Sequence, residues 1–143
     1  MTIKPLKAAH GDAMIIKCSP ENPFTIFVDG GPEDSADSVV KEFCKYDYVD
    51  LIVLTHYVED HICGLLEYVR QNLNNMNLRI EHFWVNAPDK IVVDYETQVA
   101  NYENADNLLH YLLQMRDKGI IGELVVNIHN EFLKQAYTAR TEL

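Results

Sequence analysis

The side chains best suited to chemistry lie in residues 51–65, LIVLTHYVEDHICGL. His56, Asp60 and His61 stand within six residues of one another, after an apolar run and before a helical pattern. The carboxyl end of such a strand is where α/β proteins place ligands. Imidazole and carboxylate groups suit a borderline divalent ion, so these residues predict a site for zinc, manganese or iron.

The same residues also allow a purely structural interpretation. Asp60 could cap the helix that follows, Thr55 could satisfy a turn, and the two histidines could be half-exposed polar residues. The pattern HxxxDH by itself leaves both interpretations open. Cys63, beside Gly64, is interpreted as a small buried hydrophobic residue.

The elements that position this segment follow from the spacing of apolar residues. Runs at 3–8, 13–18 and 24–28 predict three antiparallel strands joined by short turns. Apolar residues at helical spacing predict a helix over 36–43, with Ser35 as its N-cap. Leu51–Leu54 is continuously apolar, which predicts a strand covered on both faces.

The remainder alternates helix and strand. We expect a helix from about residue 60, a strand over 80–85, a long helix over 96–117 and a strand over 124–128, with a helical turn or two from Glu131. Lys118-Gly119 is a typical helix end, and Phe83 and Trp84 are expected in the core. This order predicts one layered α/β (α+β) domain over residues 1–143.

Composition narrows the function classes. The chain of 143 residues is 48% hydrophobic and 24% charged, as in a folded globular protein. A formal charge of -10 disfavours nucleic acid or an anionic membrane as a partner. The sequence has no apolar run long enough for a membrane span and no signal-peptide pattern, and its three cysteines form no CxxC motif. We therefore expect a cytoplasmic protein.

Three stretches in order resemble one known family. Residues 9–16 (AHGDAMII) look like an opening hairpin, residues 27–31 (FVDGG) look like a strand followed by Asp-Gly, and residues 56–61 (HYVEDH) look like a metal-binding HxHxDH signature. Together they resemble the metallo-β-lactamase-fold hydrolases, in the branch similar to the competence-protein hydrolase domain. The resemblance implies an αββα sandwich, of which this chain has room for the N-terminal half and part of the second.

The resemblance also implies roles for individual residues. His56 would bind a first metal, Asp60 and His61 would belong to a second, and Asp60 would orient the attacking water. Asp29 would support the site without binding the metal, although it could equally be a turn carboxylate. Val58 stands where the family has a histidine and offers no lone pair, so the resemblance implies one ion at most. His129 follows a predicted strand and is a further ligand candidate, whereas His10, His82 and His110 are interpreted as structural.

Two functions remain open. The first is metal-dependent hydrolysis of a small-molecule substrate, with water activated at His56, Asp60 and His61. The alternative is a catalytically inactive or truncated family member that acts as a binding or regulatory module. If the chain is a fragment of a longer hydrolase, its open sheet edge would need covering, so we expect a homodimer or a partner that supplies the missing second half.

Overall fold

The computed structural model describes residues 1–8, 11–18, 20–21, 23–87, 95–128, 135 and 138–139. Its regular elements are six strands, three helices and a short 3-10 turn at Glu33–Ser35. In chain order these are β1 (Thr2–Pro5), β2 (Met14–Lys17), β3 (Thr25–Val28), α1 (Ala36–Phe43), β4 (Tyr48–Leu54), α2 (Glu59–Gln71), β5 (Arg79–Ala87), α3 (Tyr95–Asp117) and β6 (Ile121–Ile128). The fold is therefore mixed α/β, as the sequence predicts.

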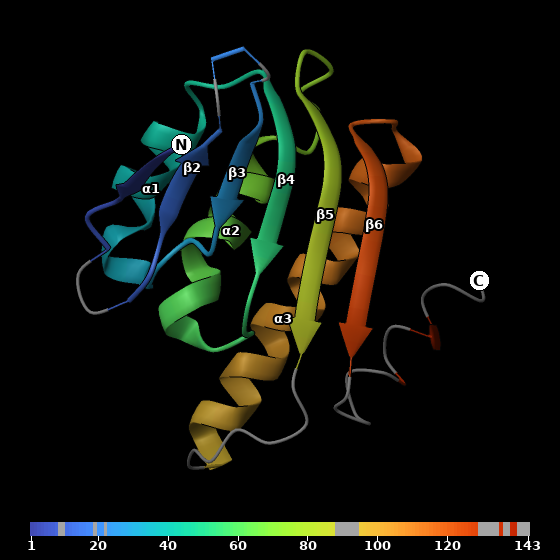
Figure 1. Cartoon of the computed structure of the whole chain (residues 1–143). Coiled ribbons are helices and arrows are strands. Elements are labelled where there is room, and N and C mark those ends of the chain that lie inside the picture. Colours follow the sequence, from blue (N-terminus) through green and yellow to red (C-terminus); the bar gives the residue numbers. More distant parts are fainter. Residues whose placement is uncertain are drawn as a thin grey trace.

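The strands form one six-stranded sheet in chain order, β1 to β6. The pairs β1–β2 and β2–β3 are antiparallel, whereas β3–β4, β4–β5 and β5–β6 are parallel. Each parallel connection contains a helix. Because such crossovers are right-handed, a sheet that always advances in one direction carries its connecting helices on one face. Figure 1 shows α1, α2 and α3 together behind the sheet.

The core lies between the sheet and these helices. One buried row crosses four strands in register, from Ile15 through Phe27 and Ile52 to Phe83. The helices add buried apolar side chains against it, among them Val39, Val40 and Phe43 of α1, Ile62, Leu65 and Val69 of α2, and Leu108, Leu112 and Met115 of α3. Phe43 stacks on Phe27 with ring centroids 4.1 Å apart. This row fixes the strands that carry the candidate site.

The opposite face of the sheet carries none of the described helices. Leu51 and Val53 of β4 are only partly buried there, and Trp84 of β5 is 44% exposed. The prediction of a strand covered on both faces is therefore wrong for the described residues, as is the prediction of Trp84 as a core residue. Phe83 is fully buried, as expected. The error arises because an apolar run does not show that all the connecting helices fall on one side.

The helices begin and end close to the predicted positions. Ser35 precedes α1 at the N-cap, although its side chain makes no capping bond. Gly119 follows α3 with a φ of 79°, a conformation that glycine adopts without strain. The chain from residue 129 to 134, with His129 and the predicted C-terminal turn, lies outside the described residues. No helix of the described part is both long and apolar enough to cross a membrane.

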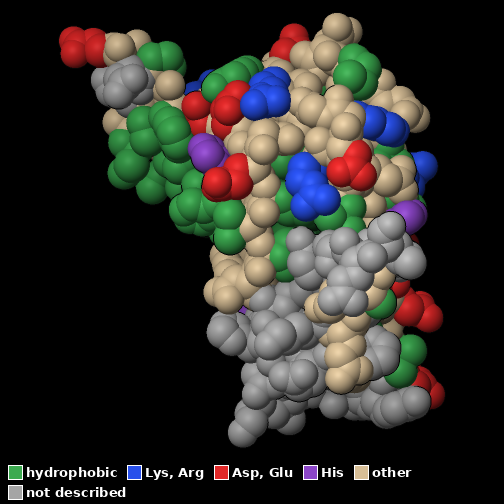
Figure 2. Space-filling model, turned by 90° about the vertical axis from the view of Figure 1, so that its right-hand side faces the viewer, with side chains coloured by type: hydrophobic (Ala, Val, Ile, Leu, Met, Phe, Trp, Pro, Cys, Tyr) green, Lys and Arg blue, Asp and Glu red, His purple; other side chains and the backbone are tan. Residues whose placement is uncertain are grey.

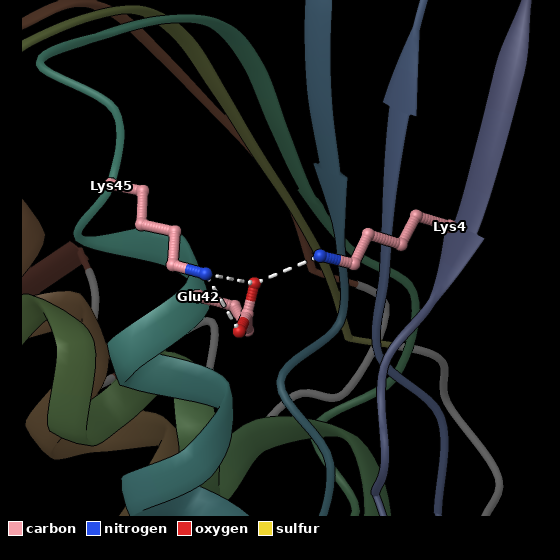
Figure 3. Close-up of polar contacts among 3 residues, drawn as sticks. All are labelled: Lys4, Glu42 and Lys45. Carbon is pink, nitrogen blue, oxygen red and sulfur yellow. Dashed lines mark hydrogen bonds and ion pairs between the residues drawn. The ribbon is translucent and has the colours of Figure 1, made fainter.

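A small ionic cluster links the sheet edge to α1. The ammonium groups of Lys4 and Lys45 both donate to the Glu42 carboxylate at 3.0 Å (Figure 3). These hydrogen bonds, that from Lys4 first, lower the pKa of Glu42. The cluster is exposed, so it adds little stability and serves mainly to orient β1 against α1.

Candidate functional site

The candidate site lies where β3 and β4 end and α2 begins. The two strands are parallel, with Val28 opposite Val53, so their carboxyl ends meet at the same edge of the sheet. Asp29 directly follows β3, Thr55 and His56 directly follow β4, and His61 lies in the first turn of α2. The fold thus brings together residues that are 32 positions apart in the sequence.

Asp29 is the centre of this site. It is only 2% exposed, and three donors contact its carboxylate. The backbone N–H of Thr55 donates to Oδ1 at 2.7 Å, and the Thr55 hydroxyl donates to Oδ2 at 2.6 Å. His61 Nδ1 lies 2.9 Å from Oδ2. Burial of a carboxylate is tolerable only with such donors, so this group is held in one position.

The backbone of Asp29 is also unusual. Its φ is 57°, in the left-handed region, and Asp29 is the only non-glycine residue of the described chain with a positive φ. Its N–H donates to the carbonyl of Val53 at 2.9 Å. Aspartate is among the few residues that enter this region, and a residue held there points to a functional constraint.

Both histidines of the segment are oriented by the same carboxylate. His61 Nδ1–H donates directly to Asp29, which leaves the lone pair on Nε2. His56 Nδ1 lies 3.1 Å from the Thr55 hydroxyl. Because that hydroxyl gives its hydrogen to Asp29, it accepts from His56, whose Nε2 then also carries a lone pair. Asp29 therefore sets the tautomer of His61 directly and that of His56 through Thr55.

The placement of the two imidazoles suits a shared ion. Their ring centroids are 5.3 Å apart. Two imidazoles bound to one tetrahedral zinc at a Zn–N distance of about 2.0–2.1 Å have centroids roughly 5 Å apart. A histidine that binds a metal usually donates its other N–H to a carboxylate, as His61 does. The donor set thus fits two of the ligands that a zinc-type ion needs.

Asp60 does not complete a ligand group. It precedes His61 in the first turn of α2 and is partly buried. In the part of the chain that the structure describes, no group of three or more His, Cys, Asp or Glu side chains gathers closely enough to hold a metal ion. The described structure therefore shows His56 and His61, but not Asp60, as a pair suited to one ion.

Asp60 is not the N-cap of α2 either. The N-cap is Val58, whose side chain makes no capping bond and whose carbonyl accepts from the N–H groups of His61 and Ile62. The structural interpretation of Asp60 as a cap is therefore wrong. The helix instead begins at Glu59, so Asp60 lies within its first turn.

The surroundings of the first turn of α2 are electronegative. Burial and, after it, the charges of Glu59, Glu33 and Asp60 together raise the pKa of the Cys63 thiol to about 12. A helix N-terminus repels cations, and these three carboxylates offset that partial positive charge. Cys63 is only partly buried, although it packs against the core as a small hydrophobic residue, and its raised pKa disfavours the thiolate.

Close backbone contact holds the Asp29 loop against α2. Gly30 donates its N–H to the carbonyl of His61 at 2.7 Å, and Gly64 donates to the carbonyl of Gly31 at 3.2 Å. A Cβ on Gly64 would overlap the carbonyl of Gly30, and a Cβ on Gly30 would overlap the backbone N–H of Leu65. The two glycines therefore set the distance between the loop that carries Asp29 and the helix that carries His61.

The turn before β2 also contacts α2. Gly11 is in such close contact that a Cβ there would overlap the carbonyl of Asp60, and the N–H of Asp12 donates to the same carbonyl at 3.3 Å. Sequence reasoning did not assign these glycines, or Thr55, a part in the site. Two features of the sequence could have identified these glycines. One is the Gly-Gly pair after an aspartate, and the other is a glycine inside a helix, where glycine normally lowers stability.

The remaining histidines lie elsewhere. His82 Nδ1 lies 3.1 Å from Glu123 on the uncovered side of the sheet, and His110 lies 2.9 Å from Gln114 on α3. His10 and His129 lie outside the described residues. The site as described thus consists of Asp29, Thr55, His56 and His61, with Asp60 beside them.

No protein-family model matches the chain, and a search of the curated proteins finds no match.

Proposed function

We propose that this protein is a metal-dependent hydrolase that uses one zinc-type ion (Zn²⁺, or Mn²⁺ or Fe²⁺) at His56, Asp60 and His61. The observation that carries the proposal is the network centred on Asp29, which leaves an Nε2 lone pair on each of two histidines whose ring centroids are 5.3 Å apart. Buried carboxylates that orient histidines in this way are typical of metal centres.

Each residue of the site has its own role in the proposed reaction. A bound zinc-type ion lowers the pKa of water towards neutrality and polarises the bond to be cleaved. His56 and His61 bind through Nε2, and Asp29 holds both rings in place. Asp60 orients the attacking water and takes up its proton. Esters, amides and phosphodiesters of small molecules are the substrates that such chemistry serves.

The finer fold is part of this proposal. A six-stranded sheet with all three helices on one face is what one half of a metallo-β-lactamase-like αββα sandwich would present (Figure 1). The Asp29-Gly30-Gly31 loop, packed on α2 beside His61, supports the same assignment. We assign residues 1–143 to a single partial domain of this kind.

A second candidate function is a binding module without catalysis. The observation that favours it is the position of Val58 in the proposed metal-binding segment. Val58 is the N-cap of α2, where its carbonyl accepts backbone hydrogen bonds and its side chain offers no metal ligand. A module of this kind would keep the Asp29 network for stability and bind no ion.

Direct metal titration separates the two candidates. Zinc binding would be measured by calorimetry and by elemental analysis after dialysis, with Co²⁺ absorption as a report of coordination geometry. The proposal expects about one ion per chain, lost in His56→Ala and in His61→Ala. Asp29→Asn keeps both ligands but removes the anionic acceptor, so its affinity for zinc should fall roughly 10–100-fold.

His110→Ala is the matched control, because it removes an exposed histidine outside the site. It should bind zinc as the unmodified protein does. Absence of zinc binding in the unmodified protein, or binding that survives both His56→Ala and His61→Ala, would refute the hydrolase proposal and favour the binding module.

A further inference from the structure

The uncovered face of the sheet is a continuous apolar surface, which we name the open face. Its central row runs in register across five strands, from Met14 through Val28 and Val53 to Trp84 and Val125. Every member of this row is apolar, although no described helix lies over it. Large contiguous apolar patches of this kind are rare on monomeric proteins and mark interaction sites.

The exposure of the open face is greatest at β5 and β6. Trp84 is 44% exposed and Val125 is 42% exposed. Residues 84–86 and 125–127 line a shallow hollow between these two strands. Figure 2, in which β6 faces the viewer and the open face lies on the left, shows hydrophobic side chains gathered on that side. The face thus presents a large indole beside a hollow.

The two rows that cross the open face contain few charged side chains. The row next to the central one contains a single pair of charged or ionisable side chains, His82 and Glu123, which lie opposite each other and contact at 3.1 Å. The chain as a whole carries a formal charge of -10. A basic partner would be attracted by this acidic charge but would find no carboxylate cluster in these two rows. A second copy of the chain can place its own open face there without bringing like charges together.

The area of the face is sufficient for a dimer. Strands of four to nine residues, at about 3.3 Å per residue and about 4.8 Å between strands, give a projected area of roughly 550 Å². Two such faces bury about 1,100 Å² or more, which clears the area of about 1,000 Å² that a specific interface needs.

We propose that the open face binds the open face of a second copy of this chain, so that two sheets pack face to face about 10 Å apart. The pairing is isologous, because a two-fold axis brings the Trp84 indole of each copy against the hollow between β5 and β6 of the other. The inference does not depend on the proposed metal site, since none of its contacts involves His56 or His61.

The chain carries its own probe of this interface, because Trp84 is its single tryptophan. Sedimentation equilibrium would give the oligomeric state over a wide concentration range, and Trp84 emission and acrylamide quenching would be followed over the same range. We expect a monomer–dimer equilibrium in which emission moves to shorter wavelengths and quenching falls as the dimer forms. Added salt should strengthen the dimer, because it screens repulsion between two acidic copies.

Val125→Glu and Val99→Glu form a matched pair, because the two valines are 42% and 38% exposed but only Val125 lies on the open face. Val125→Glu should remain monomeric, and Val99→Glu should dimerise as the unmodified protein does, with far-UV circular dichroism showing that both fold. A monomer at every concentration overturns the inference. So does a dimer whose Trp84 emission stays independent of concentration, or one that Val125→Glu leaves intact.

Discussion

Substitution of Gly64 by alanine tests the contact that sets the geometry of the candidate site. Gly64 lies inside α2, where alanine normally stabilises a helix by about 1 kcal/mol relative to glycine. In this structure, however, the new Cβ would overlap the carbonyl oxygen of Gly30, which belongs to the backbone and cannot turn aside as a flexible side chain can. Helix propensity and local packing therefore predict opposite signs for the change in stability.

The magnitude follows from the contacts that must open. Moving the Asp29 loop away from α2 weakens the hydrogen bonds Gly30 N–H to His61 and Gly64 N–H to Gly31, at 2.7 and 3.2 Å. Each contributes about 1 kcal/mol, and overpacking adds about 1–3 kcal/mol. After the gain in helix propensity of about 1 kcal/mol, we expect the free energy of unfolding to fall by about 2–4 kcal/mol, measured by urea denaturation.

Two further variants make the reasoning refutable. Gly30→Ala opens the same contact, so the double variant should lose much less than the sum of the two single losses. Gly119→Ala is the control, because a Cβ there meets no atom within 4 Å and its cost arises only from the positive φ. It should leave zinc affinity unchanged, whereas Gly64→Ala should lower it. A Gly64→Ala protein that is more stable than the unmodified one would contradict the assigned contact.

Two other predictions concern stability. Phe43→Ala removes a fully buried ring that stacks on Phe27 and should cost about 3–5 kcal/mol in urea denaturation, and a loss below about 1 kcal/mol would show that the stack is not as described. Hydrogen bonds from Arg70 and then Gln71 lower the pKa of Glu67 to about 2, so its contribution is present above its unfolded pKa and is lost as pH falls towards 2. Because the group is largely solvated, Glu67→Gln should cost only about 0.5 kcal/mol at pH 7, a difference that should narrow steadily below about pH 4.5.

The regular elements were largely predictable because they depend on local patterns. Apolar spacing placed all three helices within about one residue of their observed starts, and Gly119 marked the end of α3. The strands were less well bounded. The first was expected over 3–8 but occupies Thr2–Pro5, and β6 begins at Ile121 and not near 124. Strand ends depend on pairing with neighbours, which no local pattern records.

The uncovered side of the sheet could not be predicted in the same way. Trp84 and Leu51 look like core residues because they lie in apolar runs, and alternation with polar residues is absent there. Which face a helix covers depends on strand order and on the hand of each crossover, and these are properties of the whole chain. An apolar run therefore shows that a strand is hydrophobic on both faces but not that both faces are covered.

The candidate site, too, was only partly predictable from the sequence. The cluster His56, Asp60 and His61 was visible in the sequence because its members are close neighbours in the chain. The hydrogen bonds from His61 and Thr55 to Asp29 span 32 and 26 positions and exist only because β3 and β4 are adjacent and parallel. The Gly-Gly pair after Asp29 and the glycine inside α2 are visible in the sequence, but the contact between Gly30 and Gly64 depends on how the Asp29 loop packs on α2.

The proposed metal site and the proposed dimer interface both involve β3 and β4, but they can be tested separately. Val28 and Val53 belong to the central row of the open face, and Asp29 and Thr55 follow them by one and two residues. A second copy on the open face would therefore lie next to the site. The orientation of His61 nevertheless comes from Asp29 of the same chain, over 2.9 Å, so it does not require a dimer. Loss of zinc binding in a dimeric protein would remove the hydrolase proposal alone, and zinc binding by a strict monomer would remove the interface alone.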